Sequence, residues 1–297
     1  MHTYELAALG AAACWALNGL IAAHPSLYVG AISFNRARMS IVFVMLGAYV
    51  TMTGGWVRLA RDDAFAILAS GFIGIFFGDT AQFLALNRLG PRRTAILFAM
   101  NAPLSALLGW IALREHLSGQ TVLGIVTVII GVVLAIAFGT GSSHVHYWER
   151  VKGRLWVGLS LGGIAALAQA VGSLIVRPVM ASGANPVLVS AMRVGVAALG
   201  LSILLRLPRD TFRPTNRFTA RMLGMTALSG VLGMGVGMTL IMWALSGSSV
   251  GVVSTLAATT PALLLPLLWI RTKEVPAAGA WVGAVLVVVG SGVIFMN

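Results

Sequence analysis

The sequence predicts an all-α membrane protein whose ten transmembrane helices form two inverted five-helix repeats. Of its 297 residues, 58% are hydrophobic and only 9% are charged, whereas a soluble domain carries about 25% charged residues. The apolar residues fall into ten long runs that are separated by short polar joints. A pattern of small residues in the first half of the chain also recurs in the second half.

Each apolar run is long enough to cross a membrane, which takes about 20 mostly apolar residues. Because backbone polar groups in lipid need partners within their own segment, such runs are expected to be helices. The ten predicted spans cover residues 4–22, 29–51, 64–87, 93–113, 119–139, 155–176, 186–206, 222–245, 249–270 and 276–296. The joints carry turn and charge signals, such as HPSLY after the first span and RLGPRR after the third.

The two halves of the chain resemble each other at a shift of 159 positions. The matched pairs are Gly71, Gly74 and Gly78 with Gly230, Gly233 and Gly237, Thr80, Ala85 and Leu86 with Thr239, Ala244 and Leu245, Trp110 with Trp269, and Gly124 and Gly131 with Gly283 and Gly290. Pro103 and Pro261, and Glu115 and Glu274, agree to within one position, and Arg36 and Arg193 to within two.

These matches predict a first repeat over residues 1–140, a connecting loop over 141–154 and a second repeat over 155–297. A repeat of five spans crosses the membrane an odd number of times, so the second copy must enter in the opposite sense. Many secondary transporters have such inverted repeats, with the substrate site near the membrane midplane where the copies meet. The repeated glycines are interpreted mainly as places where helices approach closely.

The chain resembles the EamA family of the drug/metabolite transporter superfamily. The resemblance rests on ALNRLG at the end of the third span, AMNAPLSALLGWIALREHL in the fourth and GIVTVIIGVVL in the fifth, with a looser match around TTPALLLPLLWIRTKEVP in the second half. It implies a basket of ten helices in which spans 1, 3, 4, 6, 8 and 9 surround a central cavity. The family handles amino acids, purines, sugars, organic cations and other metabolites, so the resemblance does not define a substrate.

Asp79 is the strongest single indication of a functional site. It lies in the apolar run GFIGIFFGDTAQFLALN, and a charged residue near the bilayer centre normally faces a protein interior or a wet cavity. Gln82 follows three residues later on the same helix face. The functional interpretation is a carboxylate that carries a proton or binds a substrate ammonium group. The structural interpretation is an ion pair with Arg36 or Arg193.

Arg36 and Arg193 each lie about two turns inside a predicted span. A guanidinium group suits recognition of a carboxylate or phosphate, but a long basic side chain can also extend to the near membrane interface. The sequence favours this structural role over a role in binding.

Further polar and aromatic residues inside the spans are candidates for lining a cavity. The two prolines remove helix hydrogen bonds and have polar neighbours. The two amides can equally be explained by packing between helices, and for the two tryptophans aromatic packing in the core is the more common explanation. These candidates are Asn101, Pro103, Thr255, Thr259 and Pro261, then Asn18 and Gln169, then Trp15 and Trp243.

No enzyme, cofactor or metal site is expected. The sequence has no G-x-S-x-G, H-E-x-x-H or P-loop motif, and His144 and His146 have no further ligand nearby. The net charge of +12 is explained by anchoring to anionic lipid headgroups. No nucleic-acid partner is therefore expected, and the chain is expected to be a monomer.

The orientation in the membrane has two conflicting indications. The loop arginines and lysines predominate in the joints after spans 3, 5, 7 and 9, so the positive-inside rule places both termini outside. The family resemblance implies termini inside. An even number of spans places the two termini on the same side in either case.

The leading interpretation is a secondary transporter of the inner membrane that exports small metabolites, such as amino acids or related compounds, by alternating access. Protons are a candidate coupling partner at Asp79. If that carboxylate is unpaired, Asp79→Asn is expected to keep the fold and to remove the pH dependence of transport. The alternatives are an anion exchanger that uses Arg36 and Arg193, and an intramembrane enzyme acting on lipid-linked substrates.

Overall fold

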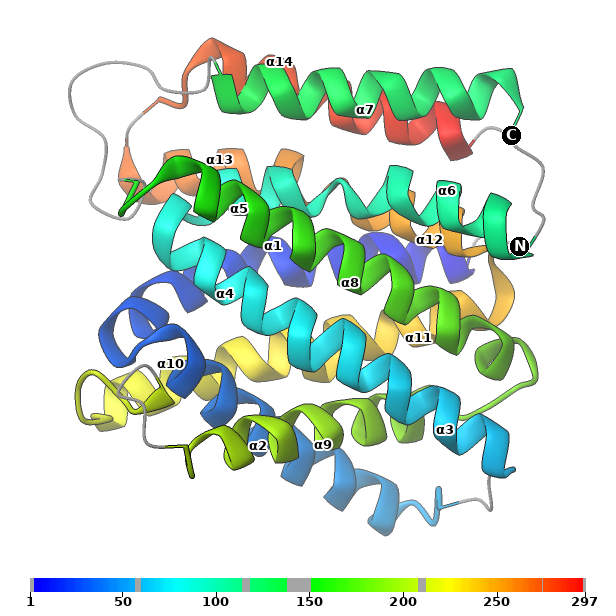
Figure 1. The fold of residues 1–297 in the computed structure, drawn as a ribbon, viewed down its shortest axis with the longest axis vertical. Helices are drawn as coiled ribbons and strands as arrows, with labels where there is room; N and C mark the ends of the chain where they lie inside the picture. Colours follow the sequence, from blue (N-terminus) through cyan, green and yellow to red (C-terminus); the bar gives the residue numbers. More distant parts are fainter. Residues whose placement is uncertain are drawn as a thin grey trace.

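The computed structural model describes residues 3–56, 60–113, 118–137, 151–207, 212–273 and 275–295. These parts of the chain are helical and contain no strand. The helices lie side by side in one bundle, and the start of the first helix and the end of the last lie at the same end of it (Figure 1). The positions of Glu115, Glu274, His144 and His146 fall outside the described residues.

The helices follow the predicted order of spans. In the first half they are α1 (Thr3–Val29), α2 (Ala31–Met52), α3 (Arg61–Ser70), the π-helix η1 (Gly71–Phe77), α4 (Gly78–Leu89), α5 (Pro91–Phe98), α6 (Asn101–Leu113) and α7 (Gly119–Ala137). In the second half they are α8 (Leu155–Ala181), α9 (Pro186–Leu204), α10 (Ala220–Gly230), the π-helix η3 (Val231–Gly237), α11 (Met238–Gly247), α12 (Val250–Ala257), α13 (Thr260–Thr272) and α14 (Ala278–Phe295).

Among the described residues, seven helical stretches are long and apolar enough to cross a membrane. They are Thr3–Val29, Arg61–Leu89, Pro91–Ala112, Leu155–Ala181, Pro186–Leu204, Ala220–Gly247 and Val250–Arg271. Val122–Gly131 and Ala278–Gly290 are shorter apolar stretches. The predicted second span forms α2, a helix of 22 residues, but it includes two arginines and an asparagine that lower its mean hydropathy.

The first predicted joint is wrong. The HPSLY segment after residue 22 is helical, and α1 continues through Pro25 to Val29. The helix ends where Gly30 adopts a positive φ of 89°, which glycine tolerates because it lacks a Cβ atom.

Corresponding irregularities interrupt the two halves. The third and eighth predicted spans each contain a seven-residue π-helix, η1 and η3. The fourth and ninth spans are each broken by a two-residue turn, at residues 99–100 and at 258–259. These turns lie two to four residues before Pro103 and Pro261, whose rings cannot donate the hydrogen bond that would continue the helix.

Contacts between joints show which ends of the helices lie together. The Thr215 N–H donates to the Val29 carbonyl (3.1 Å), and the Lys152 N–H donates to the Arg88 carbonyl (2.8 Å). These contacts bring the joints after the first and seventh spans together, and those after the third and fifth. We call this end of the bundle the basic end.

Helices α7 and α14 pack against each other at one edge of the bundle (Figure 1). A Cβ atom added at Gly290 would lie 2.7 Å from the Gly124 carbonyl oxygen, and one at Gly131 would lie 2.8 Å from that of Gly283. Both pairs are among the glycines repeated in the sequence, so close helix packing accounts for them.

Replacing Gly290 with leucine should therefore push α7 and α14 apart. We expect a loss of about 1–3 kcal/mol in stability, measured as a lower unfolding temperature of the purified protein in detergent. Gly292→Leu is the matched control, because nothing lies within 4 Å of a Cβ atom at that position. Equal stability of the two variants would show that this contact is not tight.

Candidate functional site

A cavity lies in the middle of the bundle and encloses about 650 Å³ of empty space, its open mouth included. Helices of both halves supply its walls. The lining residues are Trp15, Asn18, Gly19 and Ala22 of α1, Arg38 of α2, Asp79, Gln82, Phe83 and Leu86 of α4, Pro91, Thr94, Ala95 and Phe98 of α5, Gln169 of α8, Met234 of η3, Met238 of α11, and Thr260 and Leu264 of α13. These helices belong to spans 1, 3, 4, 6, 8 and 9, as the resemblance implied, with α2 in addition.

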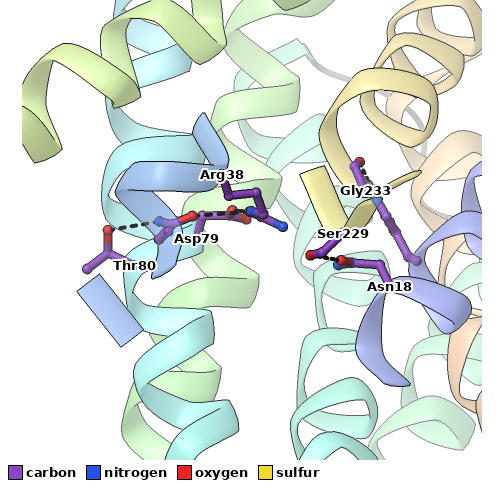
Figure 2. A network of polar contacts seen from close by, with 8 residues as sticks. Asn18, Arg38, Asp79, Thr80, Ser229 and Gly233 are labelled. Carbon is purple, nitrogen blue, oxygen red and sulfur yellow. Dashed lines mark hydrogen bonds and ion pairs between the residues drawn. The ribbon is translucent and has the colours of Figure 1, made fainter. Parts of the chain in front are cut away.

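Asp79 forms a buried ion pair with Arg38. Both side chains are almost inaccessible, with residue exposures of 6% and 1%. The Arg38 guanidinium also donates to Asn35 Oδ1 at 3.2 Å and lies 4.4 Å from the ring centroid of Phe83. Figure 2 shows the carboxylate and the guanidinium facing each other beside Thr80, whose hydroxyl accepts from Asn35 Nδ2 at 3.5 Å.

We call Asn35, Arg38, Asp79, Thr80 and Phe83 the Asp79 network. Each polar member has at least one partner within it, and the arginine also lies over an aromatic ring, a favourable cation–π contact. A buried ion pair keeps its charges only when such additional contacts support it. The network therefore holds a charged pair at the wall of the cavity.

The sequence predicted the wrong arginine as the partner of Asp79. Arg36 is partly exposed and is not among the residues that line the described cavities. The structural counterpart of Arg193 is Arg38. A Cβ atom at Gly71 would clash with the Arg193 backbone, and one at Gly230, the repeat partner of Gly71, would clash with Arg38 Cγ at 3.0 Å.

Arg193 is fully buried on α9 and has only weak partners. Its Nη1 donates to the sulfur atoms of Met238 at 3.3 Å and Met242 at 3.1 Å. Its Nε and Nη2 atoms have no hydrogen-bond partner among the described residues. Asp79 is close enough to attract Arg193 electrostatically, but its ion pair is with Arg38.

The other predicted residues in the cavity wall are Gln82, Asn18, Gln169 and Trp15. Asn18 accepts a hydrogen bond from Ser229 at 2.5 Å, as Figure 2 shows, so this amide joins the two halves. Trp15 also does so, because its indole N–H donates to the Gly233 carbonyl at 3.0 Å.

A second, smaller cavity continues from the first. Trp15 and Gln169 line both cavities, and the smaller one also has Asn101 in its wall. Its remaining lining residues are Ser173, Ile241, Val253, Ser254 and Ala257. The rings of Trp15 and Phe98 meet edge to face, 5.9 Å apart. Two cavities thus lie along the bundle, with Trp15 between them.

Five predicted residues, Pro103, Thr255, Thr259, Pro261 and Trp243, line neither described cavity. Each proline leaves one backbone carbonyl without its usual helical hydrogen bond. The Ala99 carbonyl instead accepts from the Ala102 N–H at 3.1 Å, and the Ala257 carbonyl accepts from the Thr260 hydroxyl at 2.7 Å. Thr255 is buried, and its hydroxyl has no hydrogen-bond partner within the described ranges of the chain. Trp243 is 43% exposed and lies edge to face with Tyr4.

Thr260, Met234 and Met238 were missed by the sequence analysis although they line the main cavity. Thr259 was predicted to line the cavity, but the threonine that does so is its neighbour, Thr260. The methionines gave no signal, because an apolar side chain in an apolar span does not indicate which face it occupies.

The main cavity extends from the bundle centre toward the basic end. Its lining includes Ala22 near the end of α1, Leu86 near the end of α4 and Pro91 at the start of α5. Leu86 and Pro91 lie on either side of Arg88, and Pro91 directly precedes Arg92 and Arg93. The smaller cavity lies on the other side of Trp15.

Comparison with known proteins identifies the family. The EamA-like transporter family matches residues 2–137 and 156–296. The chain belongs to the EamA-like transporter family. It is therefore a transporter and not an enzyme, and it is a multi-pass integral membrane protein.

The chain is also similar to one protein of known sequence and to one of known structure. The chain is 34% identical over 131 residues to the uncharacterized transporter YyaM of Bacillus subtilis (strain 168), a match that covers 39% of this chain and 43% of that relative. A crystal structure with 17% sequence identity superposes with a TM-score of 0.77 and covers all of this chain and 97% of its own. At that identity, the crystal structure shows the shared fold alone.

Proposed function

We propose that this EamA-like protein is a secondary active transporter that exports small metabolites, such as amino acids or related compounds, by alternating access. In this proposal ten transmembrane helices form two inverted five-helix repeats, residues 1–140 and 155–297, joined by residues 141–154. The repeated π-helices and the repeated breaks before Pro103 and Pro261 support that arrangement. Discontinuous helices at a repeat interface are typical of secondary transporters. The protein works as a monomer in the cell membrane.

The observation that carries the proposal is a cavity shared by both halves with a buried Asp79–Arg38 pair in its wall. In the empty site the two opposite charges neutralise each other. A zwitterion could open the pair, with its ammonium group at Asp79 and its carboxylate at Arg38, and no net charge would be left unpaired. Amino acids have this charge distribution.

The end toward which the cavity extends supports export as the direction of transport. This is the basic end, and the positive-inside rule makes it cytoplasmic. In an exporter, a cavity open to the cytoplasm is the state that loads substrate. Protonation of Asp79 would release Arg38, so a proton is the proposed coupling ion.

A second candidate is exchange of carboxylate or phosphate anions. One observation favours it: two buried arginines, Arg38 and Arg193, lie close to a single carboxylate. Arg36 has no part in this version, since it is absent from the walls of the described cavities.

A counterflow screen in proteoliposomes tests both candidates, with labelled amino acids, nucleosides, organic cations and dicarboxylates as probes. Gln82→Leu should reduce counterflow of the accepted probe by about tenfold, the loss of one hydrogen bond to a charged group, and should leave the unfolding temperature nearly unchanged. Gln120→Leu, at an exposed position on α7, is the control. Unchanged transport by the Gln82 variant would place the substrate elsewhere.

A further inference from the structure

We infer that a small anion, most simply a carboxylate group, binds at Arg193 in the place that corresponds to the Asp79 carboxylate in the first half. The inference depends on comparing the surroundings of Arg38 and Arg193 position by position. The two arginines occupy equivalent places, because each packs on a repeated glycine of the other half.

The partners of Arg38 have counterparts around Arg193. The shift of 159 positions places Asp79 on Met238, Thr80 on Thr239 and Phe83 on Met242. The shift of 155 positions that superposes Arg38 on Arg193 places Asn35 on Ser190. We call Ser190, Arg193, Met238, Thr239 and Met242 the Arg193 site. The hydrogen bonds agree with this correspondence, since Arg193 contacts both methionines.

The Arg193 site lacks the hydrogen bonds that complete the Asp79 network. Ser190 and Arg193 are both fully buried, and Ser190 lies one turn before Arg193 on α9. The Ser190 and Thr239 hydroxyls, like Arg193 Nε and Nη2, have no hydrogen-bond partner in the described part of the chain. Arg38 Nε also has none, but Arg38 Nη2 bonds to both Asp79 and Asn35. In the first half, the equivalent Asn35 and Thr80 bond to each other. The second half therefore keeps the donors of the network but has no carboxylate.

The Arg193 guanidinium has thioether sulfurs as its hydrogen-bond acceptors, and the Asp79 carboxylate that attracts it is already paired with Arg38. This is unfavourable, because a buried charge requires a counter-charge and hydrogen bonds of its own. The group that would meet this need is an anion with two oxygen atoms, since the guanidinium fork binds carboxylates in a bidentate manner. The hydroxyls of Ser190 and Thr239 can donate to the same oxygen atoms. The residues around Arg193 thus match a carboxylate in both charge and hydrogen-bonding groups.

Met238 connects the site to the main cavity. Its side chain lines that cavity, and its sulfur accepts a hydrogen bond from Arg193 Nη1. A methionine side chain is unbranched and changes rotamer easily, so rotation of Met238 would open a path from the cavity to the guanidinium. If the proposed export of amino acids is correct, this anion is the substrate carboxylate; the site itself does not depend on that function.

The test uses sodium acetate as the probe, with the unfolding temperature of the purified full chain in detergent as readout. Ionic strength is held constant with the sodium salt of a bulky sulfonate buffer, and acetamide serves as the uncharged analogue. Met238→Asp would give Arg193 the carboxylate that Arg38 already has. Met238→Leu is the matched control, similar in volume and without charge.

Acetate, but not acetamide, should stabilise the wild type in a saturable manner, and Met238→Leu should keep more of this stabilisation than Met238→Asp. Met238→Asp and Arg193→Gln should each weaken the apparent affinity for acetate by about tenfold or more. Equal acetate stabilisation of all four proteins, or none in the wild type, would overturn the inference.

Met238→Asp and Arg193→Gln also test whether Arg193 lacks an ion-pair partner of its own. Arg193→Gln removes a buried charge that shares its only carboxylate with Arg38, and Met238→Asp supplies a second carboxylate, so each variant should unfold at a temperature equal to or above that of the wild type. If both fail to fold, Arg193 is not an unpaired charge and the inference is wrong. If the wild type shows no counterflow of amino acids but binds acetate saturably, the proposed amino-acid export is wrong and the anion site at Arg193 stands.

Discussion

Replacing Asp79 with asparagine should strongly destabilise the protein, by about 3–5 kcal/mol. The substitution retains the shape of the side chain but leaves Arg38 buried and charged without its partner, and it also removes the carboxylate that attracts Arg193. This reverses the expectation that the variant keeps the fold, which assumed an unpaired carboxylate. The measurement is the unfolding temperature in detergent or nanodiscs, together with the yield of folded protein.

The matched control removes both charges. A double variant, Asp79→Leu with Arg38→Met, should recover most of the lost stability, because replacing a buried pair with apolar residues is often neutral or stabilising. It should not recover transport, because both polar groups are gone from the cavity wall. A stable Asp79→Asn variant would contradict the pairing, and so would a double variant as unstable as the single one.

A thiol reagent attached inside the cavity should abolish transport. Gly19 lines the main cavity and has room for a side chain, since the nearest atom to an added Cβ is 3.7 Å away. In a Cys14→Ala background, Gly19→Cys should transport normally until a bulky, membrane-impermeant methanethiosulfonate reacts with it. The loss of counterflow should then be nearly complete, because the attached group fills the path between the two halves.

The control for this experiment is Ala181→Cys, at the exposed end of α8, in the same background. It should react with the reagent and keep its transport activity. Reaction of Gly19→Cys only from the side of the basic end would support the proposed orientation of the cavity. Full transport after complete labelling of Gly19→Cys would place the substrate path outside this cavity.

Much of the fold was predictable, because hydropathy and the small-residue repeat depend on the sequence alone. The runs around residues 155–176 and 186–206 correspond directly to α8 and α9. The end of α1 was not predictable in this way, because Pro25 lies inside a helix that continues to Val29. The actual end depends on the positive φ of Gly30, and neither the composition nor the hydropathy of the joint shows it.

The candidate site was predictable only in part. Asp79 and Gln82 stood out, because polar residues in apolar spans are costly and few. The partner of Asp79 did not, because Arg36 and Arg38 lie two residues apart and the sequence cannot show which faces the interior. The shift of 159 positions that relates the two halves elsewhere does not hold between α2 and α9, where a shift of 155 relates Arg38 to Arg193. That these two arginines are equivalent is therefore seen only from their packing on Gly230 and Gly71.

Counterflow in proteoliposomes is the most direct test of substrate passage through the cavity between the two halves. Uptake of a mixture of labelled amino acids is compared between the wild type and the Asp79→Leu, Arg38→Met double variant. The unfolding temperatures of both proteins are measured first, to establish that the double variant is folded. The wild type should accumulate at least one of the amino acids, and the folded double variant should accumulate none. Equal accumulation by both proteins would contradict a role for this cavity, and absence of accumulation by the wild type would contradict amino-acid transport.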